Sequence, residues 1–216
     1  MERHESLFRF DENFSGAEEA IVAGLDEAGR GPLAGPVVAA AVMFRKKGIS
    51  LPGLNDSKKL SPRLRERLFG QIVGHALVGI GRSSESVIDE VNILEATRLA
   101  MREAVLALPL TPNLLLIDGQ IQLDLPIHQV SIIRGDGQSA AIASASIVAK
   151  VCRDHWMRQL DRLYPSYGFA VHKGYPTPTH LEELRRRGAT EVHRKTFRPV
   201  AEVLESFGLG RSGADT

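Results

Sequence analysis

Short apolar runs that alternate with helix-like stretches are the feature that most constrains the fold of this chain. Ile21–Leu25, Val37–Phe44 and Asn113–Ile117 are largely apolar and of strand length, as is typical of strands buried on both faces. Helical patterns lie between and after these runs. Because strands that alternate with helices form a sheet covered by helices, we predict an α/β fold with a mostly central sheet.

The predicted helices have recognisable ends. Ser61 precedes Pro62, and Thr177 precedes Pro178, which in each case places a capping residue before proline at the first helical position. Gly188 closes the second of these helices. The sequence therefore predicts a helical C-terminal extension after the sheet. The remaining expected elements are strands over Ala76–Ile80 and Ile127–Ile133 and helices over Ser86–Leu108, Ser139–Leu163 and Val200–Phe207.

The charge distribution points to a polyanionic substrate, although the whole chain of 216 residues has a net charge of only +1. Lys150–Thr216 holds 12 Lys/Arg and 8 Asp/Glu, a balance of +4, and the rest of the chain carries −3. A basic C-terminal third beside an acidic body fits phosphate binding next to a metal-carboxylate site. Chance scatter of a few charges is the alternative.

Neither a membrane span nor a secretory signal is predicted. The longest uncharged runs, such as Gly31–Phe44, are shorter than the roughly 20 apolar residues that a bilayer requires. Residues 1–20 lack a basic segment followed by an apolar one. Cys152 is the single cysteine and cannot form an internal disulfide, so we expect a cytoplasmic protein.

Two predicted strands lead into carboxylates. Asp26 and Glu27 follow Ile21–Leu25, and Asp118 follows the apolar run that ends at Ile117. Carboxylates are costly in a dry setting unless a cation offsets their charge, and ligands gather at strand carboxyl ends in open α/β sheets. The alternatives are a solvated turn for the first pair and a hairpin turn at Asp118-Gly119.

Asp154 is a third candidate position, on the predicted long helix. An ordinary ion pair with Lys150 or Arg158 is the alternative. Clustered carboxylates suit Mg²⁺ or Mn²⁺, which prefer oxygen ligands. Two such ions clamp an in-line phosphoryl displacement, whereas no Cys/His spacing indicates zinc.

Two further motifs could bind a ligand. Gly29-Arg30-Gly31 offers main-chain N–H groups at close range, but its spacing and its place before a strand exclude a dinucleotide fingerprint. Tyr175 lies between Gly174 and Pro176 and could stack on a sugar or base. Packing of this tyrosine onto the core is the alternative.

Taken together, these residues resemble the ribonuclease HII family over about Ile21–Val200, in unbroken order. The matching segments are Asp26–Val37 (DEAGRGPLAGPV), Leu54–Leu60 (LNDSKKL), Leu116–Gly119 (LIDG), Ala145–Val151 (ASIVAKV) with Arg153 and Asp154, Tyr167–Phe169 (YGF), His172–Thr177 (HKGYPT), His180, Gly188, His193-Arg194, Phe197 and Pro199.

The resemblance implies an RNase H-like fold, with a mixed five-stranded sheet flanked by helices and a helical C-terminal region. It implies an endonuclease, dependent on Mg²⁺ or Mn²⁺ and using two metal ions, that hydrolyses the RNA strand of RNA–DNA hybrids. It also implies cleavage at single ribonucleotides within duplex DNA, leaving 3′-hydroxyl and 5′-phosphate ends. These activities belong to DNA replication and ribonucleotide excision repair.

The resemblance also implies roles for individual residues. The family's catalytic, metal-binding carboxylates match Asp26, Glu27, Asp118 and Asp154. Its loop that senses the ribose 2′-hydroxyl matches Gly29, Arg30 and Gly31, and its tyrosine at the RNA–DNA junction matches Tyr175. Further substrate-binding positions match Lys58, Lys59, Ser146 and Lys150.

Departures from the family pattern are few. Gln120 stands where asparagine is frequent, and Ser144 where alanine is usual. We expect a catalytic domain over 21–207, an N-terminal arm over 1–20 with no assigned role, and a disordered tail over 208–216. No long heptad pattern is present, so we expect a monomer.

Two rival functions remain. The first is a noncatalytic nucleic-acid-binding module, which the intact carboxylates disfavour. The second is ribonuclease HIII, which shares the fold and carboxylates but usually carries an extra N-terminal domain, for which twenty residues leave no room.

Overall fold

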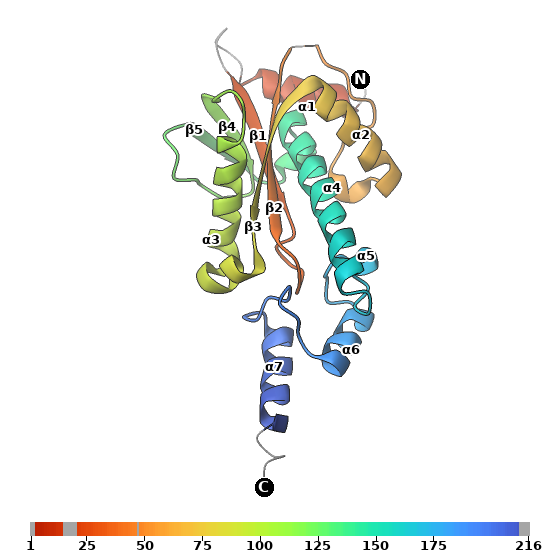
Figure 1. Ribbon diagram of the computed structural model, residues 1–216. Helices are drawn as coiled ribbons and strands as arrows, with labels where there is room; N and C mark the ends of the chain where they lie inside the picture. Colours follow the sequence, from red (N-terminus) through yellow and green to blue (C-terminus); the bar gives the residue numbers. More distant parts are fainter. Residues whose placement is uncertain (1–2, 15–20, 47, 212–216) are drawn as a thin grey trace. The chain divides into compact units, whose positions relative to one another are not determined.

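A computed structural model describes residues 3–14, 21–46 and 48–211 (Figure 1). The chain divides into two units. The sheet unit is the described part of Met1–Ala28, Val38–Arg82 and Thr97–Cys152, and the helical unit is the described part of Gly29–Val37, Ser83–Ala96 and Arg153–Thr216.

The sheet is mixed and has five strands, as predicted, in the order β3-β2-β1-β4-β5. β1 pairs with β2 in antiparallel register and with β4 in parallel register, and β4 pairs with β5 in parallel. The strands are β1 (Val22–Ala28), β2 (Val37–Phe44), β3 (Ala76–Ser83), β4 (Leu114–Asp118) and β5 (His128–Ile132).

The helices match the sequence analysis for the longer elements, whereas α1 and α5 were not predicted. The helices are α1 (Arg3–Glu12), α2 (Pro62–His75), α3 (Glu85–Leu106), α4 (Ala140–Leu163), α5 (Phe169–His172), α6 (Pro178–Arg187) and α7 (Arg198–Arg211), with single 3₁₀ turns η1 (Ser57–Lys59) and η2 (Gly135–Gly137).

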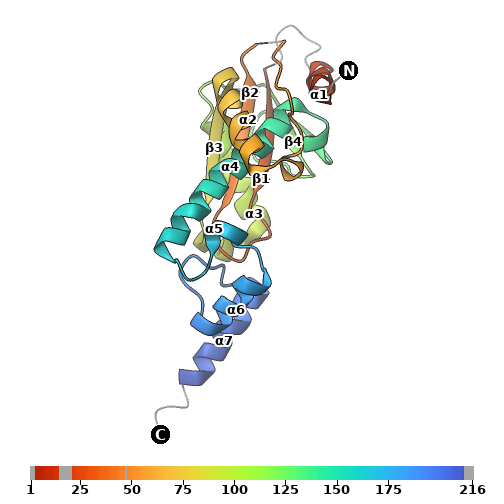
Figure 2. The ribbon, with the colours of Figure 1, turned by 90° about the vertical axis from the view of Figure 1, so that its right-hand side faces the viewer.

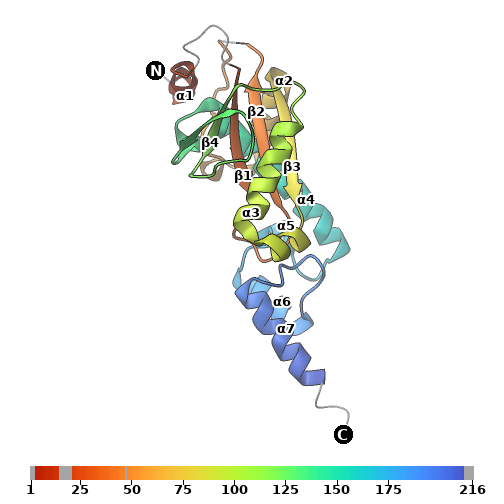
Figure 3. The same cartoon turned by 90° about the vertical axis from the view of Figure 1, so that its left-hand side faces the viewer.

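Helices cover both faces of the sheet in the sheet unit. Leu7 of α1, Ile72 of α2 and Val148 of α4 are buried together against Val42 of β2, on the face seen in Figure 2. The Thr97–Leu106 part of α3 lies on the opposite face (Figure 3). Two helical layers on one sheet account for the near-continuous apolar sequence of β2.

Gly24 in β1 lets α4 approach the sheet closely. A Cβ atom at this position would lie 2.2 Å from the main-chain carbon of Ala141, far inside van der Waals contact. Only glycine therefore permits this spacing, which brings the side chains of α4 to the centre of the sheet.

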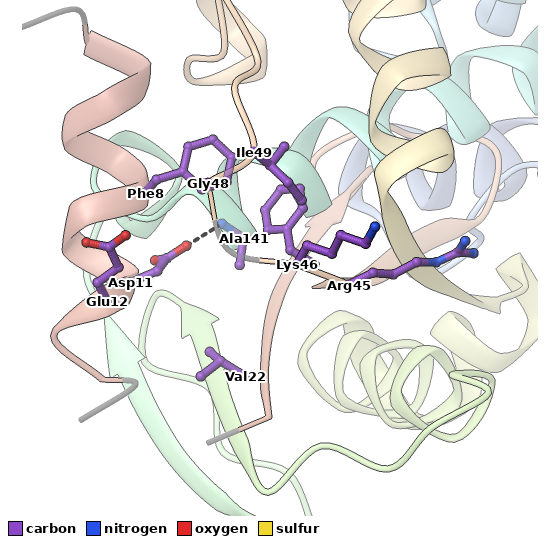
Figure 4. Close-up of a pocket in the computed structure, with 10 residues that line it drawn as sticks. Phe8, Asp11, Glu12, Val22, Arg45, Lys46, Gly48, Ile49 and Ala141 are labelled. Carbon is purple, nitrogen blue, oxygen red and sulfur yellow. Dashed lines mark hydrogen bonds between the residues drawn. The ribbon is translucent and has the colours of Figure 1, made fainter. Parts of the chain in front are cut away.

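The N-terminal helix α1 caps α4. Asp11 Oδ2 accepts a hydrogen bond of 2.8 Å from the Ala141 N–H (Figure 4), which satisfies a donor at the start of α4 that has no partner within the helix. Burial raises the pKa of Asp11 to about 6, against the lowering effect of hydrogen bonds from Ser139 and Ala141. The arm over 1–20 thus has a structural role for its helix, while 1–2 and 15–20 lie outside the described residues.

Capping signals fixed several helix ends as predicted. Ser61 Oγ accepts from the Leu64 N–H at 3.3 Å, and Thr177 Oγ1 accepts from the His180 N–H at 3.3 Å. Gly188 closes α6 with a positive φ of 82°, a conformation that glycine adopts without strain.

The prediction of an unbroken helix over Ser86–Leu108 is wrong at Asn92. This residue has φ 70° and ψ 167°, which lies outside the helical region. Its Oδ1 accepts from the N–H groups of Leu94 and Glu95 at 2.9 and 3.2 Å. Asn92 therefore acts as an internal cap at which the helix bends.

The helical unit has its own buried clusters. Leu33, Leu184 and Val200 pack together where α6 and α7 meet, and Met157 packs with Phe169. Helix α7 runs to Arg211, past the boundary at Phe207 given by the sequence, and 212–216 lie outside the described residues. In the part of the chain that the structure describes, no helix has the length and hydropathy needed to cross a bilayer.

Candidate active site

Asp26 and Glu27 lie inside β1, which continues to Ala28. The expectation that the strand ends before these acids is therefore wrong. The cause is β2, whose residues Ala40 and Ala39 pair with Asp26 and Glu27 and extend the ladder past the apolar run. Neighbouring side chains of a strand point to opposite faces, so Asp26 faces α4, on the same side as Gly24.

Asp26 is buried beside other carboxylates in the sheet unit. Only 5% of the residue is exposed. Burial, followed by the charges of Glu27 and Asp118, raises the pKa of Asp26 well above its ordinary value. Hydrogen bonds from the Ser146 hydroxyl and the Glu27 N–H, the latter 2.7 Å long, act in the opposite direction.

Asp118 ends β4 beside Asp26, because Leu25 pairs in parallel with Ile117. The strand that follows, β5, is also parallel to β4. The alternative of a hairpin turn at Asp118-Gly119 is therefore excluded. Asp118 Oδ1 accepts a 2.6 Å hydrogen bond from the N–H of Gly135 in η2, which fixes the carboxylate at the strand end.

Lys58 and Asp136 complete the charge pattern around Asp118. Lys58 Nζ lies 4.0 Å from Asp136 Oδ2. Burial lowers the pKa of Lys58, but the charges of Asp136, then Asp26, outweigh it and raise the pKa. Burial, then the charge of Asp118, raises the pKa of Asp136. These residues line a hollow of about 500 Å³ together with Asp56, Lys59, Arg134, Gly137 and Gln138.

The segment that carries Lys58 is fastened to α4. Ser57 Oγ and Ser146 Oγ, both buried, lie 2.8 Å apart. Asp56 Oδ1 accepts from the Lys58 N–H at 2.9 Å, and its other oxygen lies 3.7 Å from Lys59 Nζ. Ser146 therefore supports both Asp26 and the lysine turn from inside the unit.

Lys150 and Asp154 follow Ser146 on α4. Spacings of four residues place the three side chains along one helix face, and Lys150 is half-buried while Asp154 is 9% exposed. The division between the units falls within α4, so Ser146 and Lys150 belong to the sheet unit and Asp154 to the helical unit.

The donor chemistry of the sheet unit fits a hard divalent cation. Asp26, Glu27 and Asp118 offer carboxylate oxygens, and burial and the neighbouring carboxylates raise the pKa of Asp26, an effect that a bound cation would oppose. Across the described residues, no three His, Cys, Asp or Glu side chains already form a closed ligand group. The carboxylates are thus close in the fold but do not form a complete set of metal ligands.

The Gly29–Gly31 loop belongs to the helical unit. Gly29 has φ 102°, and a Cβ atom there would lie 2.0 Å from Arg153 Nε, so glycine is required both by conformation and by space. Arg30 is exposed. The Tyr175 ring packs beside this loop, since a Cβ at Gly31 would lie 3.6 Å from Tyr175 Cε1.

A buried arginine, Arg194, holds the loop, and the sequence analysis missed its role. Arg194 Nη2 donates to the carbonyl oxygens of Gly29 (2.6 Å) and Gly35 (2.8 Å), and Nη1 donates to that of Arg30 (2.9 Å). Burial, then the charge of Arg153, lowers the pKa of Arg194 to about 9. Arg194 therefore fixes the carbonyl groups of Gly29, Arg30 and Gly35 from inside the unit.

Arg153 is a second buried arginine that donates to main-chain carbonyl groups, here in the segment that follows the loop and at Lys173. Its Nε, Nη2 and Nη1 atoms donate to the carbonyls of Pro36 (2.9 Å), Ala34 (3.1 Å) and Lys173 (3.0 Å). Burial lowers its pKa to about 10. Arg153 and Arg194 were visible in the sequence only as parts of family-like motifs, because their partners are main-chain atoms.

The mixed sheet, the carboxylates on its parallel strands β1 and β4, and the flanking helices define a nuclease with an RNase H-like fold. Solved structures agree: the ribonuclease H2 of Pyrococcus horikoshii is 27% identical with a TM-score of 0.75, covering 87% of this chain and 98% of that one. The RNase HII of an Archaeoglobus fulgidus PCNA complex is 26% identical with a TM-score of 0.71, covering 85% and 96%.

The sequence comparisons identify the particular family. Residues 23–200 match the model of the family described as Ribonuclease HII. The Geobacillus kaustophilus ribonuclease HII is 53% identical over 95% of this chain and 78% of its own length, and that of Geotalea uraniireducens is 50% identical over 95% of both. The chain belongs to the ribonuclease HII family, as its sequence indicated. It is an endoribonuclease that hydrolyses the RNA strand of RNA–DNA hybrids.

Proposed function

We propose that this nuclease requires a divalent metal, Mg²⁺ or Mn²⁺, and also cleaves duplex DNA at single embedded ribonucleotides, leaving 3′-hydroxyl and 5′-phosphate ends. The observation that carries the metal requirement is Asp26, buried beside Glu27 and Asp118 with its pKa raised by burial and by their charges. Such a carboxylate is strongly disfavoured as an anion unless a cation is bound.

Asp26, Glu27, Asp118 and Asp154 would hold the metal. When bound, divalent cations supply Lewis-acid stabilisation of the charge that develops on the scissile phosphate. Ser146 orients Asp26 through its hydroxyl, and the Gly135 N–H orients Asp118. Both carboxylates thus have fixed directions before a substrate arrives, which is the preorganisation that catalysis rewards.

Phosphates of the substrate would bind the exposed amines near this centre. The Lys58 side chain is 81% exposed, and Lys59 is 59% exposed. The raised pKa of Lys58, which results from the net effect of the nearby carboxylates, keeps its ammonium protonated. Lys150 on α4 is the third amine in this role. Because phosphate contacts release counterions, binding weakens as salt is added.

Ribose recognition is assigned to the helical unit. The 2′-hydroxyl distinguishes RNA from DNA, and the N–H groups of Gly29–Gly31 can bind it without reading base identity. Tyr175 is 44% exposed beside Gly31, where it can stack on the sugar at an RNA–DNA junction. Cleavage is therefore expected to be independent of sequence.

One cleavage assay tests this proposal. A DNA duplex with a single ribonucleotide, labelled at either end, is incubated with the protein in Mg²⁺, in Mn²⁺ or in chelator. We expect one protein molecule to act on each duplex. We expect cuts only with metal. We also expect a DNA ligase to rejoin the products without any treatment of the ends, because they already carry a 3′-hydroxyl and a 5′-phosphate. Cleavage in chelator would overturn the metal requirement, and an uncut duplex alongside a cut RNA–DNA hybrid would overturn single-ribonucleotide recognition.

A further inference from the structure

Three histidines form a connected group behind Tyr175 in the helical unit. His172 and His180 stack with ring centroids 4.3 Å apart, and the Nε2 atoms of His180 and His193 lie 3.2 Å apart. His180 and His193 are completely buried. Phe169 packs edge-on against His180, which keeps the group dry.

Hydrogen-bond partners fix the proton on each ring. Thr190 donates its main-chain N–H to His193 Nδ1 at 3.0 Å, so the His193 proton lies on Nε2. His180 Nδ1 lies 2.9 Å from the Tyr175 carbonyl oxygen, which only accepts, so the His180 proton lies on Nδ1. His193 Nε2–H then donates to His180 Nε2, and the chain of bonds runs in one direction to Tyr175.

The imidazole rings of His180 and His193 stay neutral, as this series of hydrogen bonds requires. Burial is the main cause that lowers the pKa of His180 to about 4 and that of His193 to about 3. A proton added at His180 Nε2 would face the His193 Nε2–H, and a proton added at His193 Nδ1 would face the Thr190 N–H, so in each case two donors would meet. At neutral pH the direction of donation is therefore unique.

The residue after His193 reaches the other recognition segment. Arg194 donates to the carbonyls of Gly29, Arg30 and Gly35, and its main-chain N–H donates to Leu33 O at 2.8 Å. Two consecutive residues thus contact both the Gly29–Gly31 loop and, through His180, the Tyr175 segment. Leu33 N–H also donates to Gly174 O at 2.8 Å, which joins the two segments directly.

We propose that His193 and Arg194 are positioning residues that hold the Gly29–Gly31 loop and Tyr175 as one recognition element for a ribonucleotide at a junction. The inference rests on the proposed role of these two segments in ribose recognition. Neither residue needs to touch the substrate. Their effect is to set the spacing between the N–H groups of the loop and the tyrosine ring.

A double-mutant cycle between His193 and Tyr175 tests this. His193→Phe keeps a ring among Tyr167 and Phe169 but removes the ring's hydrogen bonds to His180 and Thr190, and His193→Gln keeps an N–H that can donate to His180. Because small misplacements of a substrate-positioning group can cost up to about 100-fold, we expect His193→Phe to lower kcat/KM on the single-ribonucleotide duplex by about 10- to 100-fold. His193→Gln should restore most of this loss.

The effect of His193→Phe is measured both in the wild-type protein and in the Tyr175→Ala variant. In Tyr175→Ala protein, we expect His193→Phe to change cleavage of the same duplex by less than about 2-fold, because its effect acts through Tyr175. Equal losses in both backgrounds overturn the inference while the proposed function stands. A Tyr175→Ala variant with unchanged substrate preference overturns the tyrosine's role and the inference together. If His193→Phe does not fold, His180→Phe, which removes the donor to Tyr175 O, enters the same cycle.

Discussion

The two units bury charge in opposite ways. The sheet unit buries Asp26 beside other carboxylates, and burial and their repulsion raise its pKa. The helical unit buries the guanidinium groups of Arg153 and Arg194, and surrounds them with main-chain carbonyl oxygens. The neighbours of Asp26 include other carboxylates, whereas each guanidinium group donates to several carbonyl oxygens.

In the proposed function, this difference separates metal-dependent chemistry from ribose recognition. A site that must take up a cation gains from charge that the protein itself does not neutralise. A site that must read a 2′-hydroxyl gains from a rigid backbone, which buried donors with several acceptors provide. The contrast predicts that removing charge strengthens the sheet unit and weakens the helical unit.

Asp26→Asn should give the largest effect. Cleavage of the hybrid should fall by about 100-fold or more, since even outer partners of metal ligands cost 10- to 100-fold. Without metal, the same variant should unfold at a higher temperature than wild type, because a repelling charge is gone. Thermal unfolding in chelator and a cleavage assay in Mg²⁺ measure the two results.

Asp124→Asn is the matched control, because Asp124 is an exposed aspartate of the same unit. It should change neither quantity appreciably. An active Asp26→Asn protein, or one with a lower unfolding temperature in chelator, would contradict the account of the sheet unit.

Arg194→Met tests the opposite behaviour. Loss of the guanidinium leaves the buried carbonyls of Gly29 and Gly35 without donors, and each unsatisfied buried acceptor costs about 1–3 kcal/mol. We expect the free energy of unfolding to fall by about 3 kcal/mol or more, measured by urea denaturation. The control is Arg198→Met, an exposed arginine of α7 that pairs with Glu202 at 2.8 Å. A stable Arg194→Met protein would show that this buried cation is dispensable.

Acid should weaken the helical unit through His193. Its pKa is about 3 when folded and about 6.5 when unfolded, so its contribution is complete above pH 6.5 and is lost as the pH falls toward 3. The stability advantage of wild type over His193→Phe should shrink by about 1.4 kcal/mol per pH unit in that window. Urea denaturation at pH 7, 5.5 and 4.5 measures it.

Asp11 in the sheet unit should show the reverse sign. Its pKa rises from 3.8 to about 6 on folding, so the folded state binds an extra proton and wild type gains stability relative to Asp11→Asn as the pH falls from 6 to 4. Parallel pH trends for the two pairs of proteins would refute the contrast.

The smallest effects come from two serines of the sheet unit. Within the described residues, the buried Ser144 hydroxyl has no hydrogen-bond partner, so Ser144→Ala should raise the free energy of unfolding by about 1 kcal/mol. Ser61→Ala removes the cap of α2 and should lower it by about 1 kcal/mol. Calorimetry of both variants checks that the same type of substitution changes the free energy of unfolding in opposite directions at the two positions.

Local signals in the sequence were sufficient for much of the fold. Ser61-Pro62, Thr177-Pro178 and Gly188 act within one helical turn, and the helix ends that they predict are confirmed. The apolar run of β2 has the predicted bounds, Val37–Phe44. In contrast, Asp11 caps a helix 130 residues away, and no local pattern encodes such a pairing.

The candidate site was predictable where side chains carry the chemistry. The carboxylates and Tyr175 stand out by residue type, although their assigned roles remain predictions. Arg153 and Arg194 do not stand out, because carbonyl oxygens are present at every residue and leave no mark in a sequence. The extension of β1 through Asp26 likewise depends on its partner β2 rather than on its own residues.

The central place of β1 also sets the order in which the chain can assemble during synthesis. β1 pairs early with β2, its neighbour in sequence, but its other edge waits for β4, and Ile21 and Asn113 at their starts are 92 residues apart. Long-range parallel pairing is slow and leaves an open strand edge in the meantime. A ribosome-bound fragment that ends before Leu114 therefore holds Asp26 and Glu27 without Asp118. From the roles proposed for these carboxylates, we expect the nascent chain to be inactive until its second half has emerged.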